Sequence, residues 1–175
     1  MDGKPRILIF TGEGKGKTTA ALGIVLRASG HGFRILVIQF IKSNPSVGEL
    51  KALRDLPGVE VLQMGSGFTP PADDPAFVEH RKAAENALGV VLKALQSKRY
   101  DLIVLDEICT AIAKGLVEED RVIELLRVGD EKVCLVLTGR GATPGLIEEA
   151  DTVTEMLCLK HGLREGWRAQ RGIEY

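Results

Sequence analysis

A glycine-rich stretch that carries two lysines is the clearest candidate for chemistry in this sequence. Residues 11–19 read Thr-Gly-Glu-Gly-Lys-Gly-Lys-Thr-Thr and lie between a short apolar run and a helical pattern. A strand, a glycine-rich turn and a helix start together form a phosphate-binding loop, because glycines let backbone amides point inward and the helix start adds partial positive charge. We therefore predict nucleotide binding by Gly12, Glu13, Gly14, Lys15, Gly16, Lys17, Thr18 and Thr19.

Two side chains of this loop have specific expected roles. Lys17 is placed to lie along the phosphate oxygens, and the hydroxyl of Thr18 is placed to ligate Mg²⁺. The first glycine of the usual G-x-x-x-x-G-K-T pattern is replaced by Thr11, so the match is imperfect. The alternative is a glycine-rich turn without a ligand.

Two carboxylates follow a second apolar run. The segment from Leu102 to Leu105 is followed directly by Asp106 and Glu107. Open α/β sheets bind ligands at the carboxyl ends of their strands, so both residues are candidate metal ligands. An acidic pair after a strand is more often a helix cap, but the phosphate loop elsewhere in the chain favours a metal site.

A third candidate is Arg140, in the sequence Thr138-Gly-Arg-Gly141. Glycines again follow an apolar run, so the guanidinium is expected to reach phosphate in the same crevice. A surface turn with a solvated arginine is the alternative.

Six short apolar runs alternate with helical patterns, which predicts an α/β fold. Near-continuous apolar runs are typical of strands covered on both faces, so we expect a mostly parallel six-stranded sheet with helices on both faces. The expected strands are Arg6 to Phe10, Arg34 to Phe40, Val59 to Met64, Leu102 to Asp106, Val133 to Thr138 and Val153 to Leu159.

Three helices are expected between these strands. Lys17 to Ser29 is apolar almost all round, as in a helix buried against a sheet. A long helix is expected to begin with Asp74 as N-cap and Pro75 in its first position, and a third to cover Glu118 to Arg127. Residues 65–74 and 161–175 show no regular pattern, and loops of this length are often functional.

Composition limits the class of protein. The 175 residues fit one domain, 1–175, and a net charge of -1 with both signs interspersed argues against a nucleic-acid partner. No apolar run approaches the roughly 20 residues of a membrane span. The cysteines, Cys109, Cys134 and Cys158, have no metal or disulfide spacing, so we expect buried thiols and a cytoplasmic location.

The chain resembles the ATP:corrinoid adenosyltransferases over essentially its whole length. The resemblance rests on the phosphate loop together with Gln39-Phe-Ile-Lys42, Gly67-Phe-Thr69, Leu105-Asp-Glu107, Thr138-Gly-Arg-Gly141 and the ending Ala169-Gln-Arg-Gly-Ile-Glu-Tyr175. The phosphate loop alone is generic, but this combination is specific. The resemblance implies a RecA-like P-loop fold.

The resemblance also implies the reaction and its participants. Members transfer the 5′-deoxyadenosyl group of ATP to the cobalt(I) of a corrinoid and release triphosphate, with Mg²⁺ or Mn²⁺ as cofactor. The nucleotide is reversed relative to most P-loop enzymes. The implied partners are a second copy in a homodimer and a flavoprotein reductase or flavodoxin as reductant, with no membrane partner.

Carried over to this chain, the resemblance assigns residues to roles. Lys17 and Arg140 contact the phosphates, Thr18 and Glu107 flank the metal beside Asp106, and Glu13 lies near the ribose. Phe68 is the aromatic that packs on the lower face of the corrin ring and favours loss of the axial ligand. Lys17, Arg140 and Phe68 are thus the expected catalytic residues, and the expected corrinoid contacts are Phe68, Thr69 and Trp167.

Two departures from the family pattern are visible. Pro70 stands where some relatives have tryptophan, so the wall below the corrin ring is expected to be built differently. Some relatives have a helical arm before the first strand, whereas this sequence begins about five residues before it. The basic tail around Trp167 is therefore a candidate for covering the site, and a solvated tail or one that packs in a dimer is the alternative.

Two other functions fit parts of the pattern. A small-molecule kinase shares a P-loop and a strand-end carboxylate pair. An ATP-dependent corrinoid carrier would bind the same ligands without chemistry. The motifs Gln39 to Lys42 and Thr138 to Gly141 favour the adenosyltransferase over the kinase.

Overall fold

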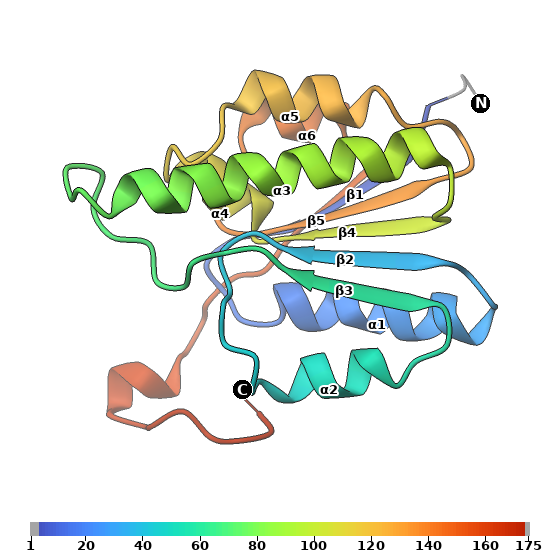
Figure 1. The fold of residues 1–175 in the computed structure, drawn as a ribbon. Coiled ribbons are helices and arrows are strands. Elements are labelled where there is room, and N and C mark those ends of the chain that lie inside the picture. The colour runs from blue at the N-terminus through green and yellow to red at the C-terminus, as the bar shows by residue number, and fades with distance from the viewer. Residues whose placement is uncertain (1–3, 174–175) are drawn as a thin grey trace.

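The computed structural model describes residues 4–173 as an α/β fold with a central sheet (Figure 1). The strands are β1 Arg6–Thr11, β2 Ile35–Gln39, β3 Val59–Gln63, β4 Leu102–Asp106, β5 Cys134–Thr138 and β6 Thr152–Glu155. The helices are α1 Lys17–Gly30, α2 Gly48–Arg54, α3 Phe77–Ser97, α4 Ile108–Ala113, α5 Glu119–Leu126, α6 Pro144–Glu149 and the 3₁₀ turn η1 Gly162–Glu165.

All six expected strands are present, and their pairings are parallel. The order in the sheet is β3-β2-β4-β5-β1-β6. Because every strand runs the same way, all six carboxyl ends meet at one edge of the sheet, and the segments that follow β1, β2, β4 and β5 are brought together there. The mostly parallel sheet predicted from sequence is thus fully parallel.

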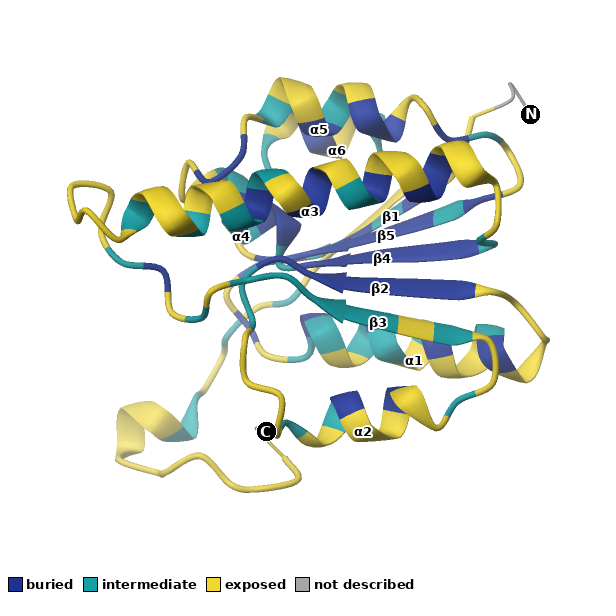
Figure 2. Cartoon of the chain, viewed as in Figure 1, coloured by how far each residue is buried: buried dark blue, intermediate teal, exposed yellow. Residues whose placement is uncertain are grey.

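Helices cover both faces of the sheet, as expected. Helices α1 and α2 lie on one face and α3, α4, α5 and α6 on the other (Figure 1). Alternate residues of each strand point to opposite faces, so Ile35 and Val37 pack toward α1 while Leu36 and Ile38 pack toward α3. Strands β2 and β4 are buried along their whole length (Figure 2).

Two details of the predicted helices are wrong. Helix α1 is not buried all round: it buries one stripe at four-residue spacing, whereas Leu26 is 61% exposed. Helix α3 begins at Phe77 with Ala76 as N-cap, not at Pro75. The Asp74 carboxylate accepts a hydrogen bond from the backbone N–H of Ala76 at 2.8 Å and so forms a turn that precedes the helix.

The last strand is shorter than predicted because the chain leaves the sheet to contact the glycine-rich loop. After Glu155, the N–H of Met156 still donates to Thr11 O at 2.9 Å, but its carbonyl accepts from the N–H of Gly14 at 2.6 Å. The expectation of three buried cysteines holds for Cys109 only, because Cys134 and Cys158 are half-buried. Burial raises the pKa of the Cys109 thiol to about 12, so that thiol is inert.

None of the helices within residues 4–173 is long and apolar enough to cross a lipid bilayer.

Candidate nucleotide-binding site

The glycine-rich loop connects β1 to α1 and depends on glycine at specific positions. Gly12 has φ 94 and Gly16 has φ 107, which are left-handed conformations that favour glycine. Gly14 is constrained by space instead: an added Cβ would lie 2.6 Å from Leu157 O and 2.7 Å from Met156 O. The segment after β6 therefore braces the outer side of the loop.

Lys17 is folded back onto its own loop. Its Nζ donates to the carbonyls of Gly12 at 2.6 Å and Gly14 at 2.7 Å, and the residue is 8% exposed. Burial lowers the pKa of Lys17, and the nearby positive charge of Arg140 lowers it further. An anionic ligand in the loop would offset both effects.

Asp106 is the most densely bonded side chain of the site. Its Oδ1 accepts from the hydroxyls of Thr18 and Thr138, each at 2.8 Å. Its Oδ2 accepts from Gln39 Nε2 at 3.2 Å and lies 3.1 Å from Lys42 Nζ. The carboxylate is almost completely buried, so these contacts compensate for its lost hydration.

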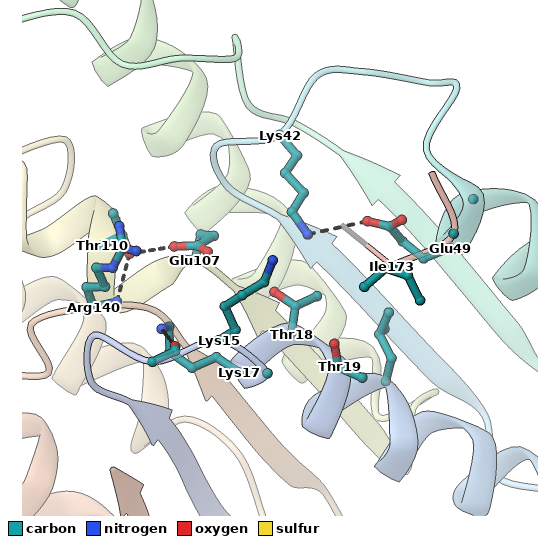
Figure 3. Close-up of a pocket in the computed structure, with 15 residues that line it drawn as sticks. Lys15, Lys17, Thr18, Thr19, Lys42, Glu49, Glu107, Thr110, Arg140 and Ile173 are labelled. Carbon is teal, nitrogen blue, oxygen red and sulfur yellow. Dashed lines mark hydrogen bonds and ion pairs between the residues drawn. The ribbon is translucent and has the colours of Figure 1, made fainter. Parts of the chain in front are cut away.

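Lys42 joins the site from the segment after β2. Besides the Asp106 contact, its Nζ lies 3.5 Å from Glu49 Oε1 at the start of α2 (Figure 3). Burial alone would lower the pKa of Lys42, but the carboxylates, Asp106 foremost, outweigh that effect and raise it. Lys42 is therefore a firmly charged cation.

Glu107 adopts a backbone conformation that is rare for a residue with a side chain. Its φ is 66 and it immediately precedes α4. The backbone N–H of Glu107 donates to Thr138 Oγ1 at 2.9 Å, and its Oε2 accepts from the hydroxyl of Thr110. Hydrogen bonds on both the backbone and the side chain thus hold the residue in place.

Arg140 joins the site from the segment after β5. Its Nε is 3.1 Å from Glu13 Oε2, and its backbone N–H donates to Thr110 Oγ1 at 2.9 Å. The Arg140 side chain is 61% exposed but lines the same cavity as the loop. The arginine predicted from sequence is therefore at the site and not on a remote surface turn.

One cavity of about 680 Å³ brings most of these residues together (Figure 3). Its lining comes from the loop and α1, from the segments that follow β2, β4 and β5, and from the tail. The lining residues are Gly14, Lys15, Gly16, Lys17, Thr18, Thr19, Leu22, Lys42, Gly48, Glu49, Glu107, Thr110, Arg140, Gly172 and Ile173. Gly12, Glu13 and Asp106 do not line it and contact residues that do.

The expected corrinoid contacts line two other cavities. Phe68 and Thr69 line one of about 350 Å³ with Lys114, whose Nζ lies 5.6 Å from the centre of the Phe68 ring. Trp167 lines one of about 430 Å³ within the tail, and this cavity shares Lys15 and Ile173 with the nucleotide cavity. The structure therefore does not gather the three residues around one space.

The site contains oxygen ligands suited to a hard cation. Thr18 and Glu107 line the same cavity, and Asp106 lies behind Thr18. Hydroxyl and carboxylate oxygens with phosphate are the usual ligands of Mg²⁺. Among residues 4–173, no cluster of three or more histidine, cysteine or acidic side chains forms a metal cage. These residues fit a cation that is held jointly by protein and phosphate.

Sequence reasoning missed several residues of the site. In the sequence, Lys42 and Thr138 stand out only as members of family motifs, and Thr110 and Glu49 belong to no motif. Lys42 has a detectable signal, because it follows a buried strand at the ligand-binding edge of the sheet. For Thr110 the only sequence signal of a site role is its position one helical turn after Glu107.

Comparison with known proteins gives the family. The family described as ATP:corrinoid adenosyltransferase BtuR/CobO/CobP matches residues 3–175. The chain belongs to this family. A corrinoid adenosyltransferase of Pseudomonas aeruginosa is 42% identical over 170 residues, which cover 97% of this chain and 83% of that protein.

Two further relatives are also named corrinoid adenosyltransferases. The corrinoid adenosyltransferase of Escherichia coli K12 is 36% identical over 175 residues, covering 100% of this chain and 88% of that protein. Corrinoid adenosyltransferase CobA of Salmonella typhimurium is 37% identical over 174 residues, covering 97% and 85%. The resemblance found in the sequence motifs is confirmed.

A solved structure supports the fold. The KaiC-like protein PH0186 of Pyrococcus horikoshii superposes with a TM-score of 0.57 at 16% identity, over 91% of this chain and 75% of that chain. At this identity the likeness concerns the fold alone. The predicted α/β fold, a parallel six-stranded sheet with helices on both faces, is confirmed.

Proposed function

We propose that this chain transfers the 5′-deoxyadenosyl group of ATP to the cobalt(I) of a corrinoid and releases triphosphate. The match of residues 3–175 to the adenosyltransferase family carries the proposal. The site supports it, because Gln39 and Lys42 of the Gln-Phe-Ile-Lys motif bond directly to Asp106 behind the phosphate loop. The motif that distinguishes the family is thus connected to the part that all P-loop proteins share.

The reaction is an alkyl transfer. Cobalt(I) supplies an electron pair to C5′ of the ribose, a cobalt–carbon bond forms, and the C5′–oxygen bond breaks with its electrons leaving on triphosphate. Cobalt(I) is itself the nucleophile, so no side chain needs to accept a proton. The protein contributes positioning and stabilisation of the charge that develops on the leaving group.

Three groups of the nucleotide cavity meet that need. Residues 14–19 line the cavity along the loop and the start of α1, where backbone amides and the helix dipole favour an anion. Lys17 would break its hydrogen bonds to the carbonyls of Gly12 and Gly14 and donate to phosphate oxygens instead. Arg140 would contribute a second cation from the segment after β5.

We also propose that Mg²⁺ binds between Thr18 and Glu107, with Mn²⁺ as an alternative cation. When bound, it would neutralise phosphate charge. Both oxygens of Asp106 already accept hydrogen bonds from the protein, so Asp106 would act on the metal through Thr18. Thr18 must then turn its hydroxyl proton away from the metal, and Asp106 is the acceptor that holds it.

Further proposals concern the corrinoid and the setting of the enzyme. Phe68, Thr69 and Trp167 would contact the corrinoid, with Phe68 on the lower face of the ring. The chain would act in the cytoplasm as a single domain of residues 1–175 and as a homodimer, with electrons from a flavoprotein reductase or flavodoxin. The exposed Phe68 ring and the exposed Trp167 side chain are available for such contacts.

The test is an anaerobic assay with ATP, Mg²⁺ and chemically reduced cobalamin, followed by chromatography of the products. We expect adenosylcobalamin and triphosphate in equal amounts, and almost no ATP consumption when corrinoid is left out. ADP as the major product would overturn the proposal in favour of a kinase. Intact ATP in the presence of bound corrinoid would instead indicate a carrier.

A further inference from the structure

The hydroxyl of Thr110 contacts two candidate site residues at once. Thr110 lies in the first turn of α4 and lines the nucleotide cavity. Its Oγ1 donates to Glu107 Oε2 and accepts from the backbone N–H of Arg140 at 2.9 Å (Figure 3). One hydroxyl thereby joins the segment that follows β4 to the segment that follows β5.

The chain around Thr110 is packed so that this link has little freedom. Gly139 has φ 135, and a Cβ added there would lie 2.5 Å from Thr110 N and 2.8 Å from Thr110 Oγ1. Residues 138–141 therefore approach the start of α4 as closely as the backbone permits. A small, branched side chain with a hydroxyl satisfies this space and both hydrogen bonds.

The two hydrogen bonds have different consequences. Glu107 is half-buried, lines the cavity and has several rotatable bonds, so without the Thr110 hydroxyl its carboxylate would sample many orientations. Without an acceptor, the N–H of Arg140 would lose its partner and the peptide that carries the guanidinium would shift. Both changes would reduce the preorganisation of the site.

We propose that Thr110 is a positioning residue that couples the metal-binding carboxylate of Glu107 to the phosphate-binding segment of Arg140. This inference rests on the proposed function, since it concerns how the same site holds ATP with its cation. Thr110 touches neither the triphosphate nor the cation in this assignment. It fixes the groups that do, as outer-shell partners of metal ligands commonly do.

The test compares Thr110→Val with Thr110→Ser. Valine keeps the shape and removes the hydroxyl, whereas serine keeps the hydroxyl and removes the methyl group. Each protein is titrated with ATP by calorimetry, with Mg²⁺ and with EDTA, and its thermal unfolding is measured. The steady-state constants are then measured with reduced cobalamin.

We expect Thr110→Val to weaken ATP binding in Mg²⁺ by roughly 10-fold to 100-fold, the usual effect of losing an outer-shell partner. In EDTA the loss should be smaller, because only the Arg140 segment is affected. Thr110→Ser should stay within about threefold of the wild type in both titrations.

The outcomes separate this inference from the proposed function. Equal ATP affinity in Mg²⁺ for the wild type and the valine variant would overturn the role of Thr110, whatever reaction the enzyme performs. Equal losses in the valine and serine variants, together with lower unfolding temperatures, would also overturn it and indicate a packing role. A wild type that binds ATP with Mg²⁺ but forms no adenosylcobalamin would overturn the proposed function and leave the Thr110 link to be judged by the titrations.

Discussion

Lys42 and Asp106 form an ion pair at the carboxyl edge of the sheet, with Nζ 3.1 Å from Oδ2. The lysine side chain is 29% exposed and the carboxylate side chain is 1% exposed. A buried carboxylate loses its hydration, and the positive charge of Lys42 compensates Asp106 for that loss. The ion pair therefore supports the acceptor to which Thr18 bonds.

Replacing Lys42 with methionine should destabilise the fold and weaken nucleotide binding. Removing one partner of a buried pair costs roughly 3–5 kcal/mol, and the partial exposure of Lys42 reduces our expectation to about 2 kcal/mol. Urea unfolding measures this loss. The matched control is Lys98→Met, which breaks an exposed pair with Asp130 and should cost less than about 1 kcal/mol. Equal costs would mean that the Lys42 pair is a solvated surface contact.

The contribution of Lys42 should also depend on pH. The pKa of Lys42 is raised in the folded protein above its ordinary value of 10.5, so folding favours the charged lysine. The stabilisation is therefore complete below about pH 10.5 and is lost as the pH rises through the folded pKa. The difference in unfolding free energy between the wild type and Lys42→Met should be constant from about pH 8 to pH 9 and shrink above about pH 10.5. A difference that grows with alkalinity would contradict the assigned charge state.

Gly14→Ala should damage the phosphate loop through sterics alone. The new Cβ would meet the backbone carbonyls of Met156 and Leu157, which cannot move as a side chain can. We expect the free energy of unfolding to fall by about 1–3 kcal/mol and ATP binding to be almost lost. Gly89→Ala is the control, because nothing lies within 4 Å of its added Cβ in the exposed middle of α3. The free energy of unfolding of Gly89→Ala should rise by about 0.5–1 kcal/mol.

Backbone strain at Glu107 predicts an unusual order of stabilities. At φ 66 a Cβ is unfavourable, so Glu107→Gly should be more stable than Glu107→Ala by about 1 kcal/mol. Both variants should lose Mg²⁺-dependent ATP binding. At Lys93, an exposed position inside α3, the order should reverse, with alanine more stable than glycine by about 1 kcal/mol. Chemical unfolding of the four proteins measures both orders. If alanine is more stable than glycine at both positions, strain at Glu107 is excluded.

Phe68→Ala should affect reduction of the corrinoid more than the fold. The ring is 92% exposed and contacts the Lys114 ammonium, so its loss should change the unfolding free energy by less than about 0.5–1 kcal/mol. If Phe68 acts on the axial ligand, adenosylation from cobalt(II) with a weak reductant should fall much more than adenosylation from preformed cobalt(I). Equal losses in the two assays would make Phe68 a general contact of the corrinoid.

The sequence predicted the sheet well because buried parallel strands have a strong local signal. Four or five consecutive apolar residues, at 35–38, 102–105 and 133–137, identify β2, β4 and β5 without knowledge of their neighbours. The short helices α2, α4 and α6 were missed, because each has six or seven residues and completes too few turns for a periodic pattern to be visible. The phosphate loop was recognised because its geometry is set by consecutive residues.

The parts of the site that were missed depend on contacts across the sequence. Thr110 gains its importance from the N–H of Arg140, 30 residues away, and no local pattern specifies that approach. The brace on the loop joins Gly14 to Met156 and follows from β1 and β6 being neighbours in the sheet. The strand order had to be known before either contact could be inferred.

That strand order also limits when the enzyme can acquire its ligand during synthesis. Strand β1 leaves the ribosome first, yet its two neighbours in the sheet, β5 and β6, are the last strands to emerge. The glycine-rich loop is therefore made early and remains without its supporting strands until nearly the whole chain has been translated. We therefore expect ATP to stabilise only the nearly complete chain, because the loop lacks the strands on both sides of β1 until β5 and β6 are made. During most of translation the apolar β1 segment lacks both of its sheet neighbours, and an unpaired apolar strand is prone to aggregation.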